Sequence, residues 1–219
     1  MNAQDVYNLL DANKNERGIA NASRNRIANF TTFGIGLTQL KQLAKQIGKS
    51  HDLALELWKH DIYDMRVIAV LIEDPKQVTR AQIEAQVADL EFWMFSHVYA
   101  TTLLAKVKFQ RELIAEWHKD DNHVKRRLAY NMLYNLLKSD KTLDDDYYVP
   151  FLDIIERDLQ SEENMVRDAM NNALGFIGKY RPGLRGRVLT AAQNIGPVEV
   201  DYGDNSCKPL DVAALLSRS

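Results

Sequence analysis

The chain has 219 residues, 46% of them hydrophobic and 26% charged, and a formal net charge of −2, a composition typical of globular proteins. No stretch approaches the roughly 20 consecutive apolar residues that cross a bilayer, and the N-terminus lacks the basic and apolar regions of a signal peptide. Cys207 is the only cysteine, which excludes an internal disulfide and fits a reducing cytoplasm, where we expect this protein to act.

Apolar residues recur at helical spacing along most of the chain, and no segment shows the alternation of a strand pair. The clearest apolar stripes, in chain order, lie at 37–47, 53–58, 67–72, 128–137, 151–159 and 166–177. Gly48 and Asp74-Pro75 are stop signals, and Thr79 is suited to cap the helix that follows it. Residues 139–144 read as a loop, and Pro182-Gly183 separates two late helices.

Short connections between helices of this length predict antiparallel pairs. Stacked pairs of the HEAT or armadillo kind fit the spacing, and such arrays make a concave surface suited to a long partner. We therefore predict an all-α fold, a single-domain α-solenoid of stacked antiparallel HEAT-like helix pairs that form a curved superhelix. The domain spans residues 1–219, with an N-terminal helical cap at 1–30 and a C-terminal loop and short helix at 196–219.

Charge is unevenly distributed along the sequence. Residues 106–127 hold seven Lys or Arg against four acids, and 167–187 hold five basic residues against Asp168 alone. The intervening segment, 140–163, carries nine acids against two basic residues. This alternation either places positive charge on one face of the array, where it would attract a phosphate backbone, or is ordinary solvated helix surface.

Five segments, taken in order, resemble the AlkD-type family of HEAT-like-repeat DNA alkylation repair proteins over roughly residues 30–195. They are Thr32–Lys41 with Leu43–Lys45, Leu53–Trp58 with Asp64–Ala69, Trp93–His97, Trp117 with Val124–Arg127, and Val166–Lys179. The resemblance implies a superhelical array that holds double-stranded DNA on a basic concave face. It also implies removal of cationic N3- or N7-alkylpurines by hydrolysis of the N-glycosidic bond, with two tryptophans and an aspartate at the lesion.

The individual positions match only in part. Trp93 corresponds to the first family tryptophan, but His97 stands at the position of the catalytic aspartate. In the family the aspartate stabilises the cationic sugar that forms as the base leaves, whereas an imidazolium would repel that cation. Asn172 stands where the second tryptophan is usual, and Gly175 replaces an arginine. These departures predict weak or absent glycosylase activity.

The run Lys125-Arg126-Arg127 corresponds to the family's phosphate-contacting residues, with Arg127 at the position of the contacting arginine. Because three adjacent helical residues fan around the helix, we expect Arg127 to make the contact with one neighbour assisting. The resemblance implies no cofactor, no metal and no membrane partner, and we expect a monomer. For Trp93, His97 and the run 125–127, the alternative interpretation is that they are ordinary core or solvated surface residues.

Several other patterns favour structure over chemistry. Trp58 and Trp117 lie in apolar stripes, which predicts that they are core residues. His118, Asp120, Asp121 and His123 do not have the spacing of a usual zinc site. The alternative to a DNA-binding protein is a non-catalytic HEAT-repeat scaffold for protein interactions that has lost nucleic-acid binding, and it would not show the steep salt dependence of phosphate contacts.

Overall fold

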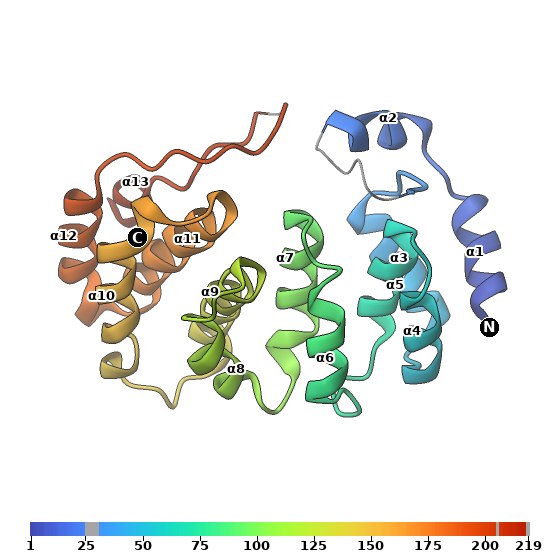
Figure 1. The fold of residues 1–219 in the computed structure, drawn as a ribbon, viewed down its shortest axis with the longest axis horizontal. Coiled ribbons are helices and arrows are strands. Elements are labelled where there is room, and N and C mark those ends of the chain that lie inside the picture. The colour runs from blue at the N-terminus through green and yellow to red at the C-terminus, as the bar shows by residue number, and fades with distance from the viewer. Residues whose placement is uncertain (25–30, 205, 218–219) are drawn as a thin grey trace. The chain divides into compact units, whose positions relative to one another are not determined.

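The computed structural model describes residues 1–24, 31–204 and 206–217, and its regular elements are almost all helices (Figure 1). Within these ranges the one β-feature is an isolated parallel bridge between Thr31 and Ile62. The parts of the predicted terminal segments at 25–30, 205 and 218–219 lie outside the described residues. None of the described helices is long and apolar enough to cross a bilayer.

The elements of the first half are α1 (Ala3–Asp11), α2 (Glu16–Arg24), α3 (Leu37–Ile47), α4 (His51–Trp58), α5 (Tyr63–Ile72), α6 (Arg80–Val87), α7 (Trp93–Thr102) and the 3-10 helix η1 (Leu104–Lys106). Those of the second half are α8 (Gln110–Trp117), α9 (His123–Ser139), η2 (Asp145–Tyr147), α10 (Val149–Asp158), η3 (Leu159–Ser161), α11 (Asn164–Tyr180), η4 (Pro182–Leu184), α12 (Arg185–Ile195) and α13 (Val212–Ser217).

Local sequence signals explain several helix ends. Gly48 follows α3 with a φ of 83°, in the region that glycine adopts at low cost, so α3 ends where the sequence predicts. The Thr79 hydroxyl accepts a hydrogen bond from the Gln82 amide at 3.1 Å, and this confirms the predicted cap of α6. The α9 helix ends at Ser139, where the predicted loop begins.

The described residues divide into two compact units, the first built around Met1–Lys108 and the second around Phe109–Tyr202 together with α13. The prediction of one domain over the whole chain stays a prediction. Unit 1 is centred on α5, which packs against α3, α4 and α7. Nine of its ten residues are buried, as its nearly continuous apolar sequence predicts.

A buried carboxylate fastens the segment before α3 to the start of α5. Asp64 is 0% exposed, and its side chain accepts hydrogen bonds from the Thr32 hydroxyl at 2.6 Å and from the Phe33 and Ile35 amides at 2.7 and 3.1 Å. A buried carboxylate needs such donors to offset its lost hydration. Residues 32–35 are thereby held in place ahead of α3.

Unit 2 is organised around two 17-residue helices, α9 and α11, which pack against each other. The α8 helix packs on α9, and α12 and α13 pack on α11. Trp117 at the end of α8 is 1% exposed, and Trp58 in unit 1 is 9% exposed, so both tryptophans are core residues as predicted. Their indole groups are therefore not available to stack on a flipped or damaged base.

Candidate functional site

Trp93 and His97 lie one turn apart on α7, as the sequence predicts. The Trp93 side chain is partly exposed, and its ring contacts that of Phe92 with centroids 6.2 Å apart. His97 is exposed, and its carbonyl oxygen accepts a hydrogen bond from the Thr101 hydroxyl at 2.8 Å. Residues at positions i, i+4 and i+8 share one helix face, so Trp93, His97 and Thr101 form an accessible stripe, which we call the α7 stripe.

No acid lies on the α7 stripe, and the two acids that immediately precede α7 belong to other surroundings. Asp89 accepts a hydrogen bond from the Trp58 indole at 2.8 Å and pairs with Arg66 at 3.7 Å. Glu91 is exposed and lies before the first residue of α7. The resemblance leads us to expect aromatic rings and a carboxylate at an excision site. On the α7 stripe only the rings are present, the indole of Trp93 and the imidazole of His97.

The predicted basic run occupies the first turn of α9, where its charges already have partners within the protein. Arg126 donates to both oxygens of Glu162, at 2.9 and 2.8 Å, and this ion pair raises the pKa of its guanidinium. The Lys125 ammonium lies 3.3 Å from the Asp120 carboxylate and 5.7 Å from the centroid of the Trp117 ring. Arg127 is only 3% exposed.

These contacts determine what the α9 turn offers to a ligand. Lys125 and Arg126 keep part of their surface, whereas Arg127 presents very little. A phosphate that approached this turn would meet Lys125 and Arg126 first, and it would compete there with Asp120 and Glu162. The role of Arg127 as the phosphate contact stays a prediction, and it requires the guanidinium to move outward.

Asn172 lies on α11, the helix that packs against α9, and its side chain is partly exposed. The neighbouring Asn171 is 1% exposed and donates from its amide to the Leu210 carbonyl at 2.8 Å. Gly175, one turn after Asn171, is buried beneath the segment that leads into α13. A Cβ atom at Gly175 would lie 2.6 Å from a methyl carbon of Leu210.

The C-terminal segment therefore covers the position where the family resemblance places an arginine. Gly178 is in the same situation, since a Cβ there would lie 2.8 Å from a methyl carbon of Leu216. Two glycines three residues apart on α11 leave the space that α13 fills. Position 175 cannot contact a ligand in this chain, because it has neither a side chain nor an exposed surface.

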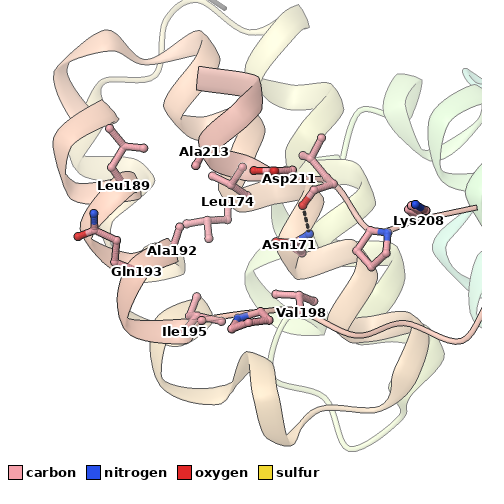
Figure 2. A pocket seen from close by; sticks show the side chains of 15 residues that line it. Asn171, Leu174, Leu189, Ala192, Gln193, Ile195, Val198, Lys208, Asp211 and Ala213 are labelled. Atoms are coloured by element: carbon pink, nitrogen blue, oxygen red, sulfur yellow. Dashed lines mark hydrogen bonds between the residues drawn. The ribbon is translucent and has the colours of Figure 1, made fainter. Parts of the chain in front are cut away.

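Beside this contact, α11, α12 and the C-terminal segment enclose a pocket of about 510 Å³ (Figure 2). Its wall is formed largely by apolar side chains, among them Leu174, Leu189, Ala192 and Val198, and Figure 2 shows the Asn171 amide reaching the backbone of the C-terminal segment. Lys208 and Asp211 are the charged residues at its edge. This lining suits an apolar group better than a phosphate.

Unit 1 contains a second pocket, of about 560 Å³, with a very different lining. We call this cavity the lysine pocket. Its polar lining residues are Lys41, Lys45, Lys49, Thr101, Thr102 and Lys106. Ala44, Gly48 and Leu71 complete it. Thr101 also ends the α7 stripe, so the stripe leads directly into the lysine pocket.

The predicted basic blocks did not include the three α3-side lysines, although the sequence holds a signal for them. Lys41, Lys45 and Lys49 recur at intervals of four, a spacing that aligns them along one side of a helix and its extension. These lysines do not form a dense basic block, because glutamines and small or apolar residues separate them in the sequence. Among the residues that the structure describes, no group of three or more His, Cys, Asp or Glu is arranged to hold a metal ion.

Comparison with known proteins places these features in a family. Residues 6–196 match the family of the DNA alkylation repair enzyme. Uncharacterised proteins of Listeria innocua and Listeria monocytogenes are each 24% identical to the chain, over 85% of its length and 83% of theirs.

The match with one solved structure covers 100% of this chain and 93% of the other chain, with a TM-score of 0.86 and 22% sequence identity. That protein is described as one of a new family related to the HEAT-like repeat DNA glycosylases with affinity for branched DNA structures. The likeness confirms the predicted all-α fold of stacked HEAT-like helix pairs. The family match covers most of the sequence, including both ends of the α7 stripe, the α9 turn and α11, and the chain belongs to the DNA alkylation repair enzyme family.

Proposed function

We propose that this chain is a DNA-binding member of its family that does not excise alkylated bases. The observation that carries the proposal is the exposed imidazole of His97 beside Trp93, at the position where the family resemblance places a carboxylate. Departure of a cationic alkylpurine leaves positive charge on the sugar, and a carboxylate stabilises that charge. A neutral imidazole supplies only a weak dipole, and an imidazolium opposes the charge.

DNA remains the ligand class that best fits the family and the fold. The related protein with affinity for branched DNA shares the whole fold, so branched DNA belongs in the proposal beside the duplex. Trp93 would pack against the backbone or an unstacked base, and Lys125, Arg126, Arg127 and Asn172 would be the contacts that unit 2 contributes. We place this activity in the cytoplasm, with no cofactor and no metal.

The first experiment measures base release and binding in the same samples. The protein is incubated with duplex DNA that carries N7-methylguanine or N3-methyladenine, and released base is compared with a no-protein control. We expect no release above that control, together with binding that weakens steeply as salt rises. A four-way junction and a linear duplex of equal length compare the two DNA structures. Release well above the control would overturn the non-excising half of the proposal, and salt-insensitive or absent binding would favour a protein-interaction scaffold.

Restoring the acid tests the role of position 97. His97→Asp is expected to raise release of N7-methylguanine above that of the wild-type protein by up to about 100-fold, because a carboxylate at a developing cation contributes on that scale. His97→Asn is the matched control, since it has the shape of the aspartate without its charge. Equal release by the two variants would show that the carboxylate alone does not rebuild the site, and would direct attention to Asn172 and Gly175.

A further inference from the structure

Three of the four lysines of the lysine pocket carry charge that no ion pair of the described residues neutralises. Lys41, Lys45 and Lys106 are exposed, and none of the three forms an ion pair with a residue in the described ranges. Three arginines of unit 2 differ in this respect, since Arg126, Arg181 and Arg187 each face a carboxylate. Positive charge without a partner in the protein is charge available to a ligand.

Three chain segments bring these groups to one place. Lys41 and Lys45 lie one turn apart on α3, Lys106 ends η1, and Thr101 and Thr102 end α7. Ammonium groups and hydroxyls are the donors that phosphate oxygens accept from, and here the lysines and Thr102 are the candidates, since the Thr101 hydroxyl already donates to the His97 carbonyl. The side chains come from elements packed into the same unit, so the arrangement belongs to the fold and not to one flexible loop.

Lys49 also lines this pocket, and two hydrogen bonds hold its side chain. Its ammonium donates to the carbonyl oxygens of Leu71 at 3.1 Å and Glu73 at 2.6 Å. Burial lowers the pKa of Lys49, and the charge of Lys106 lowers it further, while Asp74 and Glu73 oppose both effects. Of the other pocket lysines, Lys106 contributes to this shift, so an anion bound between Lys49 and Lys106 would offset the repulsion of these two ammonium groups.

We propose that the lysine pocket binds phosphate groups, and that it holds the backbone of the DNA that unit 1 contacts. The inference rests on the proposed DNA binding for the identity of the ligand, whereas the phosphate chemistry follows from the pocket itself. The α7 stripe runs from Trp93 through His97 to Thr101, so a strand whose phosphates occupy the pocket continues along α7. Backbone contact without base readout makes this binding independent of sequence.

The test removes two of the available charges and compares two probes. Lys41→Ala/Lys45→Ala is measured against Lys14→Ala/Lys59→Ala, which removes the same charge from two exposed lysines of unit 1 outside the pocket. Lys49 is left intact because its hydrogen bonds support the fold. The probes are a labelled duplex of arbitrary sequence, titrated at several salt concentrations, and inorganic tripolyphosphate, titrated by calorimetry.

We expect the pocket variant to bind duplex about tenfold more weakly and its salt slope to fall by about 2 in magnitude, since each lysine contact contributes about 1. Tripolyphosphate binding is expected to be lost in the same variant, and the control variant is expected to stay close to the wild type with both probes.

The two probes separate failure of this inference from failure of the proposed function. If duplex and tripolyphosphate binding were equal in the two variants, the pocket would not be the phosphate site even where DNA binding is real. If the wild-type protein ignored duplex but bound tripolyphosphate through Lys41 and Lys45, the pocket would stand and the DNA function would fall. Absence of both interactions would overturn both.

Discussion

Replacement of Asp64 by alanine is expected to lower the free energy of unfolding by about 2 to 6 kcal/mol, because two buried amide donors lose their acceptor and each costs about 1 to 3 kcal/mol. These donors are the Phe33 and Ile35 amides, and the Thr32 hydroxyl loses its partner as well. The shift in the urea midpoint, with the slope of the transition checked for change, measures the effect.

Asp61→Ala is the matched control for this prediction. Asp61 is exposed and lies 3.7 Å from Arg66, so its removal is expected to change stability by no more than about 0.5 kcal/mol. If the two variants unfolded at the same denaturant concentration, the hydrogen bonds of Asp64 would contribute no more than a surface charge pair does. A large loss in Asp64→Ala alone identifies residues 32–35 as fixed by this one carboxylate.

The second large effect is expected at Gly175. Gly175→Arg restores the residue type that the family resemblance places there, but its Cβ would collide with Leu210 and its side chain would have to pass beneath α13. Overpacking of this kind costs about 1 to 3 kcal/mol. We expect a lower midpoint of unfolding and faster cleavage of the chain around Leu210–Leu216 in limited proteolysis, because the C-terminal segment is displaced.

Gly186→Arg provides the comparison in the same unit. Gly186 lies on α12, is exposed, and has no atom within 4 Å of the place where its Cβ would be. The same substitution there is expected to leave both the unfolding midpoint and the proteolysis pattern near those of the wild-type protein. Similar behaviour of the two variants would mean that α13 is held on α11 too loosely to register the added side chain.

Much of the helical framework follows from local sequence. The stripes at 37–47, 67–72 and 166–177 each fall in a helix of the structure, because period-3.6 burial is a property of a short window. The ends at Gly48 and Thr79 depend on a single residue each and were equally predictable. The burial of Trp58 and Trp117 followed from their place in apolar stripes.

Features that depend on distant partners did not follow from the sequence. The acceptor of Arg126 is Glu162, 36 residues further on, so a charge block that reads as a phosphate site is partly neutralised in the fold. The opposite holds for Lys41 and Lys45, whose helix lacks acids to pair with them and whose charge therefore remains available. From the sequence, Gly175 was interpreted as the replacement of a family arginine. The position of Leu210 in the structure explains why a side chain at 175 has no room.

The packing of α13 on α11 also bears on the order in which unit 2 forms during synthesis. The face of α11 that carries Gly175 and Gly178 is closed by Leu210 and Leu216, which are made more than thirty residues later. Until those residues leave the ribosome, a nascent chain presents that face uncovered, and unit 2 completes its core only afterwards. A ribosome-bound chain stalled at Tyr202 is therefore a natural place to look for chaperone contacts that the finished protein no longer makes.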